Sequence, residues 1–542
     1  MAGEQGHRPR AYRRAARGVA ACPEPLEALA SQGRLREIAG IGPSLEALIT
    51  EFLHTGSMRT HARLTAEHPP GLAPVLQARG FGPAGIQSLH AALGVRDLDD
   101  IERAAHEGRL AEALGPRRAQ ELVAQLPALR NPIRVLRLKP AWERAEQVAA
   151  MLRDSRQVRQ LVIAGQVRRG CEMVTAGIDL IAVADASLLD LVIALPGVQR
   201  VVARDGSHAR VRLLDGLELR VFLASAATLG SALVLHTGAD GHLARLRTLA
   251  AARGVDLDSL AAPTEDAVYG MLGLPWIAPE LREDSGEIEA AVRDDLPVLV
   301  ELADLRGDMH CHTDWTDGSA SLEDMARAAR DRGYAYMALT DHSRSLTITN
   351  GLSLERLEQT RRRVERVNRD LAPFVVLLGT EMDILEDGSL DYPDEVLATL
   401  DYVSASVHSR FRQAEPAMTS RILRAVEHRL VHTLNHPHGR LLGTRPAYAV
   451  DMARVVSAAS AAGTAMEVSG DPARMDLDGG WARQVKAAGG LCTISSDAHS
   501  TLDFLNIWLG VASARRGWLT RDDVLNTRPL DELKRLLARR TP

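Results

Sequence analysis

Short apolar segments alternate with helical segments from residue 304 to the end of this 542-residue chain. Examples of the apolar segments are YMALTDHS, VVLLGTEMD, YVSASVHS and GTAMEVSG. Repeated strand–helix alternation predicts parallel strands with helices around them, as in a barrel. We therefore expect a distorted (β/α) barrel over residues 304–542, with a functional site at the carboxyl ends of its strands.

Histidine and carboxylate residues lie at the ends of these predicted strands. One such histidine alone is more often a structural residue than a metal ligand, but nine candidates at successive strand ends favour a metal site. Imidazole and carboxylate groups suit zinc, manganese or iron, with the choice set by geometry and supply. The nine candidates are His310, His312, Asp317, His342, Glu381, His408, His436, Asp497 and His499.

The identity and order of these residues resemble the polymerase-and-histidinol-phosphatase (PHP) domain. The segments GRLLG, PARMDL and GVASARRGWLTRDDVLNT are similar to the version of this domain that is fused to bacterial family X DNA polymerases. The resemblance implies a site of about three divalent metal ions that hydrolyses phosphoesters. It leaves His438 outside the ligand set, and His432, inside the predicted strand VHTLNH, is interpreted as structural.

The resemblance also implies roles within the site. One ion is expected to be surrounded by the residues that carry catalysis, which are His310, His312, Glu381 and Asp497. Glu381 is expected to bridge to a second ion that His408 also holds. The four remaining candidates would complete the second and third positions.

Two sets of neighbouring residues are expected to support this site. Carboxylates can orient ligand histidines, and the candidates are Asp308, Asp341 and Asp383. Arginines just past strand ends can hold DNA phosphates, and the candidates are Arg344, Arg410 and Arg440.

Two segments of the N-terminal part, IAGIGPSLEALITEFLHTG and ARGFGPAGIQSLHAALGV, resemble each other. In each, a Gly-Pro element precedes a helix with an apolar face. Their glycines (Gly40, Gly42, Gly80 and Gly82) permit unusual backbone conformations and can present bare N–H groups to a phosphate. The pattern resembles the helix-hairpin-helix motif, which binds the DNA backbone without reading sequence. A plain helical bundle with glycine caps is the alternative.

The distribution of charge supports a polyanionic partner at this end of the chain. Residues 1–140 carry 19 Lys and Arg against 14 Asp and Glu, whereas the whole chain has a net charge of −5. An excess of positive charge attracts nucleic acid, and an acidic remainder suits metal sites. The stretch RPRAYRRAARGVAA is interpreted as a basic helix at the edge of a DNA-binding region.

The middle of the chain contains LVIAGQVRRGCEMVTAGIDLIAVAD and DGLELRVF. These segments resemble the palm of family X DNA polymerases, where three aspartates hold two Mg²⁺ ions for nucleotidyl transfer. Arg168, Arg169 and Asp179 match the family's motif, but Gly177 replaces the first aspartate and Glu218 the third. Loss of a bridging carboxylate leaves two cations poorly neutralised. We therefore expect a degenerate polymerase site, which would bind Mg²⁺ only if polymerase activity survives.

The segment EDAVYGMLGLPWIAPELREDSGEIEAA resembles the end of the family's thumb. A multidomain α/β protein is therefore expected. Its parts are an α-helical helix-hairpin-helix region at residues 1–140, a nucleotidyltransferase-like α+β palm and thumb at 141–295, and a PHP domain at 304–542. The four cysteines have no paired spacing, and no apolar run approaches the roughly 18–20 residues of a membrane span. We expect a cytoplasmic protein, monomeric and without membrane contact.

These features favour a DNA-repair phosphodiesterase that acts as a 3′→5′ exonuclease on gapped DNA or 3′ ends, without sequence preference. Cleavage at abasic sites and removal of 3′-phosphates are further activities that the resemblance implies. One alternative is an active gap-filling polymerase with an attached nuclease. Another is a non-catalytic DNA-binding scaffold whose metals are structural. A phosphatase for a small metabolite is less favoured, because the N-terminal two-thirds would then have no purpose.

Overall fold

The computed structural model describes residues 24–538, apart from residues 39, 79, 131–133 and 156, together with five single positions before residue 24. The basic stretch RPRAYRRAARGVAA lies mostly outside the described residues. The chain forms two compact units, Met1–Ile133 and Arg134–Pro542.

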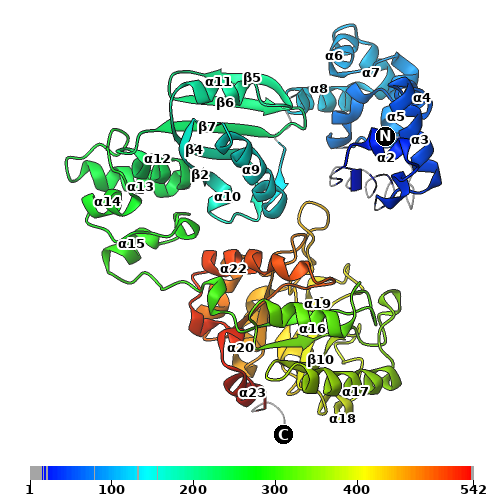
Figure 1. The fold of residues 1–542 in the computed structure, drawn as a ribbon, viewed down its shortest axis with the longest axis vertical. Helices are drawn as coiled ribbons and strands as arrows, with labels where there is room; N and C mark the ends of the chain where they lie inside the picture. Colours follow the sequence, from blue (N-terminus) through cyan, green and yellow to red (C-terminus); the bar gives the residue numbers. More distant parts are fainter. Residues whose placement is uncertain are drawn as a thin grey trace. The chain divides into compact units, whose positions relative to one another are not determined.

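The first unit is helical, and its two hairpins repeat one backbone course. In each, a glycine with positive φ (+90° at Gly40, +81° at Gly80) follows a 3-10 segment, and an α-helix then starts on proline. Proline starts a helix well because its missing N–H would have no partner there. The helical segments are α2 (Leu26–Ser31), η1 (Leu35–Glu37), α3 (Pro43–Thr55), α4 (Arg59–Glu67), η2 (Pro70–Gln77), α5 (Pro83–Leu93), α6 (Leu98–His106), α7 (Arg109–Leu114) and α8 (Pro116–Arg130) (Figure 1).

The second unit begins with a five-stranded mixed sheet in the order β2-β4-β7-β6-β5. Strand β4 is parallel to β7 and antiparallel to β2, and it is buried along nearly its whole length. An apolar run such as IDLIAVA suits the centre of a covered sheet. The elements are β1 (Leu136–Arg137), α9 (Leu138–Arg153), β2 (Val158–Ala164), α10 (Gly165–Arg168), β3 (Met173–Val174), β4 (Ile178–Ala184), α11 (Ser187–Ile193), β5 (Val198–Arg204), β6 (His208–Leu213) and β7 (Glu218–Ala224).

A small helical subdomain follows this sheet and packs around the buried Tyr269. Two residues of the RRGCE segment (Arg168–Glu172) connect this subdomain to the sheet through ion pairs. Arg168 donates two hydrogen bonds to Glu265 (2.6 and 2.8 Å), and Arg169 pairs with Glu283 at 2.7 Å. The elements are α12 (Leu229–Thr237), α13 (Asp240–Ala251), α14 (Glu265–Met271), η3 (Pro279–Leu281), α15 (Glu287–Val292) and η4 (Leu302–Asp304).

Seven parallel strands in sequential order, β8 to β14, form the C-terminal part. A parallel bridge between Cys311 and Ala498 joins the two ends of the sheet, so the barrel is nearly closed. The strands are β8 (Gly307–Cys311), β9 (Tyr336–Leu339), β10 (Val375–Asp383), β11 (Tyr402–Ser406), β12 (Thr433–Leu434), β13 (Ala465–Ser469) and β14 (Cys492–Ser495).

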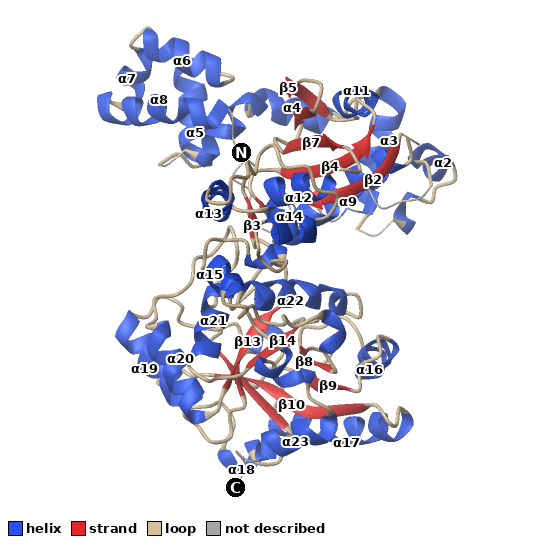
Figure 2. Cartoon of the chain, turned by 90° about the vertical axis from the view of Figure 1, so that its left-hand side faces the viewer, coloured by secondary structure: helices blue, strands red, loops and turns tan. Residues whose placement is uncertain are grey.

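Helices surround these strands, as the alternating sequence pattern predicts (Figure 2). Helix α16 shows why: Leu322, Met325, Ala326 and Ala329 share its buried face, and Ser321 caps its start by accepting from the N–H of Asp324. The other elements are η5 (Thr347–Thr349), α17 (Leu354–Asp370), α18 (Asp394–Leu397), α19 (Glu415–Val426), α20 (Met452–Ala462), α21 (Gly479–Ala487), η6 (Asp503–Asn506), α22 (Ile507–Arg516), η7 (Arg521–Asp523), η8 (Leu525–Thr527) and α23 (Leu530–Ala538).

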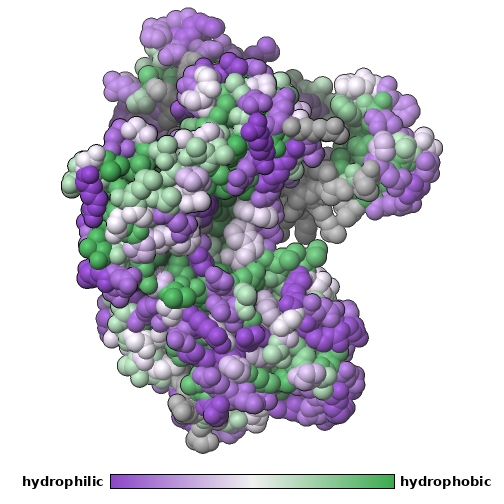
Figure 3. Space-filling model, turned by 60° about the vertical axis from the view of Figure 1, so that its left-hand side comes forward, coloured by the Kyte–Doolittle hydropathy of each residue, from purple (hydrophilic) through white to green (hydrophobic). Residues whose placement is uncertain are grey.

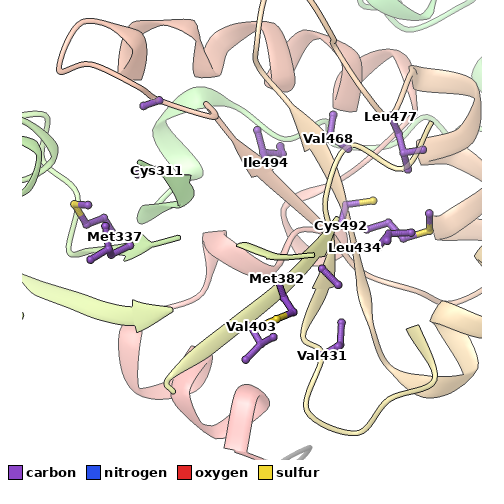
Figure 4. Close-up of a cluster of buried hydrophobic side chains, with 14 of the residues drawn as sticks. Cys311, Met337, Met382, Val403, Val431, Leu434, Val468, Leu477, Cys492 and Ile494 are labelled. Atoms are coloured by element: carbon purple, nitrogen blue, oxygen red, sulfur yellow. The ribbon is translucent and has the colours of Figure 1, made fainter. Parts of the chain in front are cut away.

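One large apolar core stabilises this barrel. Side chains from successive strands, among them Met382, Val403, Leu434 and Ile494, lie in it and are at most 1% exposed (Figure 4). A core of this kind leaves the polar ends of the strands as the place for chemistry. The predicted barrel, the palm-like sheet and the helical N-terminal region are confirmed, whereas the residue boundaries of the three predicted domains stay predictions.

The palm-like sheet and the barrel share an apolar cluster, which combines Leu138, Val167 and Val174 with Met475 and Leu509. Helix α22 of the barrel also makes polar contacts with the palm and with the helical subdomain that follows it. Arg516 donates to the carbonyl of Arg169 (3.1 Å) and to Glu283 (2.7 Å). The barrel therefore packs directly on the RRGCE segment of the palm.

Among the described residues, no helix combines the length and apolar character that crossing a membrane requires. Hydrophilic and hydrophobic residues are mixed over the face shown in Figure 3.

Candidate metal centre

The nine candidate ligands lie at the carboxyl ends of the barrel strands. His310 is in β8 and His312 directly follows it; Glu381 is in the last third of β10. His342, His408 and His436 each come two or three residues after their strands end, and Asp497 follows β14 by two. Because neighbouring strands are parallel, these side chains meet at one mouth of the barrel.

Three overlapping groups of side chains could each hold one metal ion, with ligand atoms within 4.8 Å of one another. The groups share His312 and His342, so the three positions are contiguous. They are His310, His312 and Asp497; His312, Asp317, His342 and His499; and His342, Glu381 and His408.

Glu381 joins its own group to that of His310 and also contacts His436, the candidate outside the three groups. The two carboxylate oxygens of Glu381 face different histidines: Oε2 lies 3.4 Å from His310 Nε2 and 3.1 Å from His342 Nδ1, and Oε1 lies 2.8 Å from His436 Nε2. Bridging of two ions by Glu381 stays a prediction, and this arrangement of its two oxygens suits it. The Nδ1 atoms of His312, His342 and His436 are buried and make no hydrogen bond, the 3.1 Å approach of Glu381 to His342 included, so they are available as metal ligands. The donor set therefore fits divalent transition metals.

A carboxylate that the sequence analysis passed over orients one of these ligands. Glu467 of β13 is fully buried and lies 2.7 Å from His310 Nδ1. Its second oxygen accepts from the backbone N–H of His436 at 2.7 Å. A buried glutamate within the apolar strand AMEVS was the available signal, because such a charge needs a partner.

Of the three carboxylates expected to orient histidines, one does so. Asp383 lies 2.7 Å from His408 Nδ1. Asp308 instead accepts from the backbone N–H groups of His310 and Ser496, and Asp341 accepts from Thr313 and Thr316. In the described part of the chain, Asp308 and Asp341 make no hydrogen bond to a ligand ring; they hold the backbone and hydroxyl groups beside the ligands, so the expectation is wrong for these two.

The electrostatics of the cluster keep its carboxylates ionised. Burial opposes the charge on Asp497, but His310 and His312 hold the pKa of this carboxyl well below its usual range. Burial and the neighbouring histidines lower the pKa of His312 to about 3. His312 is therefore neutral, which is the form of imidazole that binds a metal. Asp497, Glu467 and Glu381 instead outweigh burial and raise the pKa of His310 well above its ordinary value, so this ring must lose a proton to bind one.

The three arginines expected to hold DNA phosphates all have protein partners. Arg344 pairs with Asp391 at 3.2 Å and Arg410 with Glu386 at 3.1 Å. Arg440 pairs with Glu172 of the palm at 3.0 Å. Their contact with DNA stays a prediction.

In the palm-like sheet, ion pairs between neighbouring strands lie where the family's motif would bind metal. Asp179 of β4 pairs with Arg220 of β7 at 2.5 Å, in line with the register of the two strands. Glu218 of β7 pairs with Arg210 (2.6 Å) and Arg212 (2.5 Å) of β6. Guanidinium groups therefore neutralise both remaining carboxylates of the motif. Burial raises the pKa of Asp179 to about 6 despite Arg220.

Gly177 lies at the position of the motif's first aspartate, and its backbone leaves no room for a side chain. Its φ is +89°, and a Cβ added there would lie 2.5 Å from the backbone oxygen of Glu218. An aspartate could therefore not occupy this backbone without a shift. Positions 177 and 218 do lie together, and position 179 is joined instead to Arg220.

The hairpin glycines lie as the sequence pattern predicts. Gly42 and Gly82 precede α3 and α5, and a Cβ at either one would meet no atom within 4 Å. Open space around a helix start leaves its N–H groups accessible.

The nearly closed barrel with its histidine and carboxylate cluster defines a metal-dependent phosphoesterase of the PHP class. Three known families match parts of the chain: the helix-hairpin-helix domain at residues 1–58, the DNA polymerase beta thumb at 232–283 and the PHP domain at 308–461. The chain is also 32% identical to the DNA polymerase/3'-5' exonuclease PolX of Bacillus subtilis (strain 168), over 99% of this chain and 96% of that protein. The chain belongs to the family of these bacterial X-family polymerases with a PHP domain.

Two shorter relatives are named as phosphatases. A probable phosphatase of Thermoanaerobacter sp. (strain X514) is 27% identical over 41% of this chain and 89% of its own length. A probable phosphatase of Shewanella frigidimarina (strain NCIMB 400) is 29% identical over 35% of this chain and 77% of its own length.

The matches to the helix-hairpin-helix domain and to the polymerase thumb indicate that the chain binds DNA.

Proposed function

We propose that this protein is a DNA-repair 3′→5′ exonuclease whose chemistry takes place in the PHP barrel and whose palm no longer polymerises. The observation that carries the proposal is the meeting of eight of the nine ligand candidates in three contiguous groups at the barrel mouth, with the ninth, His436, 2.8 Å from Glu381. About three zinc, manganese or iron ions fit these donors. Ions held there supply Lewis acidity toward a phosphoester and toward an attacking water.

The protein's own residues arrange this site. Glu467 fixes the ring of His310 and Asp383 that of His408, so each presents its other nitrogen, Nε2, to the mouth. Glu381 and Asp497 stay ionised and supply negative charge without a proton to lose. The hairpins of the first unit would hold the DNA backbone through Gly40, Gly42, Gly80 and Gly82, so binding would not depend on sequence.

The loss of polymerase activity rests on the palm's ion pairs. Two-metal nucleotidyl transfer needs free carboxylates that face the same side of the sheet. Asp179 and Glu218 are instead paired with Arg220 and with Arg210 and Arg212. A Mg²⁺ ion would have to displace a guanidinium that is already in place. An active gap-filling polymerase is therefore the less supported alternative. A non-catalytic scaffold with structural metals is less supported as well, because the relatives are named as an exonuclease and as phosphatases.

The finer points of the proposal concern substrate and setting. Gapped duplexes and 3′ ends are the proposed substrates, and cleavage at abasic sites and removal of a 3′-phosphate the proposed further activities. The names of the two shorter relatives favour the removal of a terminal phosphate. We further propose a monomer that acts in the cytoplasm.

The test is degradation of a 5′-labelled, 3′-recessed primer by the full chain supplied with Mn²⁺. The wild type is expected to shorten the primer one nucleotide at a time, and His310→Ala and Asp497→Ala to leave it intact. A parallel duplex with a 3′-phosphate measures release of inorganic phosphate. No shortening with Mn²⁺, Zn²⁺ or Fe²⁺ would overturn the proposal, and equal activity in the wild type and both variants would assign the activity to a contaminant.

A further inference from the structure

One buried guanidinium at the barrel mouth has no place in the set of ligands. Arg474, in the loop after β13, has a side chain that is only 20% exposed, and its Nε lies 3.4 Å from Oδ2 of Asp497 and 3.4 Å from Oδ2 of Asp471. The other oxygen of Asp497, Oδ1, lies 3.4 Å from His310 Nε2 and 3.4 Å from His312 Nε2. One carboxylate thus faces the histidines on one side and Arg474 on the other.

The guanidinium of Arg474 is poorly satisfied by the protein. Its Nε is buried without a hydrogen-bond partner, and among the described residues its side chain makes ion pairs only with those two aspartates. The guanidinium is charged and planar, and it lies beside a carboxylate that is a candidate metal ligand. Its remaining N–H groups can therefore donate hydrogen bonds to an oxygen of a bound phosphoryl group.

Contacts that begin in the palm fix the loop that carries Arg474. Arg440 donates to the backbone carbonyl oxygens of Arg474 (3.1 Å) and Met475, and the same guanidinium pairs with Glu172 at 3.0 Å. Glu172 belongs to the RRGCE segment, and its side chain is 17% exposed. A continuous set of contacts therefore runs from the palm through Arg440 to the backbone of Arg474.

We infer that Arg474 binds a non-bridging oxygen of the substrate's phosphoryl group, and that Glu172 of the palm positions Arg474 through Arg440. The inference rests on the proposed hydrolysis of phosphoesters at the same mouth. It gives the RRGCE segment a use that needs no nucleotide: Glu172 supports the neighbouring active site. In this account Arg440 acts by holding the loop, a role that replaces the predicted contact of this one arginine with a DNA phosphate.

The probe is inorganic phosphate, titrated calorimetrically into the Mn²⁺-loaded full chain, with bound metal counted by mass spectrometry. Because one charge-assisted hydrogen bond is lost, Arg474→Gln is expected to raise the Kd for phosphate about 10- to 100-fold with an unchanged metal count. Arg474→Lys keeps the charge without the planar fork and is expected to recover part of the loss. The control is Arg535→Gln on the exposed side of α23, whose side chain donates to the carbonyl of Asp531.

An unchanged Kd in Arg474→Gln would overturn the inference. Loss of metal in that variant would also overturn it, because Arg474 would then act only by holding Asp497. If the wild type binds phosphate through Arg474 but shortens no primer, the proposed nuclease function fails while the assignment of Arg474 stands.

The positioning role of Glu172 is tested with Glu172→Gln, and Glu143→Gln, on the exposed side of α9, is the control. Glu172→Gln is expected to weaken phosphate binding roughly 10-fold and to lower kcat/KM for the primer by the same factor, with bound metal and Tm near wild-type values. A drop in Tm with unchanged phosphate affinity would show a role in stability alone and overturn this part.

Discussion

Glu467 offers the sharpest test of how the barrel prepares its ligands. The change is Glu467→Gln, which keeps the size of the side chain and replaces one carboxylate oxygen by an NH₂ group. Glu467 is fully buried, so solvent cannot compensate for the change. We expect the variant to fold and to bind its metals more weakly.

The magnitude follows from the hydrogen bonds that Glu467 accepts. Oε1 lies 2.7 Å from His310 Nδ1 and 2.6 Å from Ser495 Oγ, and Oε2 lies 2.7 Å from the N–H of His436. In a glutamine, whichever way the amide turns, its NH₂ group faces one of these sets of donors. One mismatched donor in a buried site costs about 1–3 kcal/mol, which corresponds to about 10- to 100-fold in metal affinity.

The assay is a Mn²⁺ titration read by exonuclease activity and by the bound metal that remains after gel filtration. The control is Glu287→Gln in the helical subdomain before the barrel, where an equally buried glutamate lies 2.6 Å from His242 Nδ1. We expect the control to lose stability and keep its metal affinity. An unchanged Mn²⁺ affinity in Glu467→Gln would refute the argument that this carboxylate sets the ring of His310.

Three further predictions concern the palm, the thumb and the hairpins. Asp179→Ala is expected to leave exonuclease kcat/KM within about twofold of wild type, measured on a 3′-recessed primer; a large loss would return the palm carboxylate to the chemistry. The pKa of Glu265 falls from 4.5 to about 2 because its hydrogen bonds with Arg168 and Arg282 outweigh burial. Its ion pair therefore stabilises the fold above pH 4.5, and this stabilisation is lost as the pH falls toward 2. The difference in unfolding free energy between the wild type and Glu265→Gln should shrink by about 3 kcal/mol over that window, measured by urea denaturation; a constant difference would contradict it. Gly80→Val, at a φ of +81°, is expected to weaken DNA binding, measured by fluorescence anisotropy, while log K falls linearly with log salt for the wild type; unchanged affinity would remove this hairpin from the interface.

The sequence was most informative where a repeating pattern and chemistry coincide. Strand–helix alternation predicts a barrel, and parallel strands bring residues that follow successive strands to one mouth, so the convergence of His310, His408 and Asp497 could be anticipated. The three overlapping groups could not, because they depend on rotamers and loop paths that no spacing encodes.

The ion pairing of the palm carboxylates depends on the register of the strands. Asp179 and Arg220 are partners only because β4 and β7 run in parallel at one particular alignment. Nothing in the separate segments GIDLIAV and LELRVF determines that alignment. The pairing of Asp179 and Glu218, the two carboxylates that remain of the motif, with arginines could therefore not be predicted. The contact between Glu172 and Arg440 likewise needs the packing of the palm on the barrel.

The most direct measurement uses one reaction: a 5′-labelled primer in a one-nucleotide gap, supplied with Mn²⁺, Mg²⁺ and all four deoxynucleoside triphosphates. We expect products shorter than the primer and none longer, with shortening abolished in His310→Ala. Products one nucleotide longer that persist in His310→Ala would contradict the account, because the palm would then be the working active site.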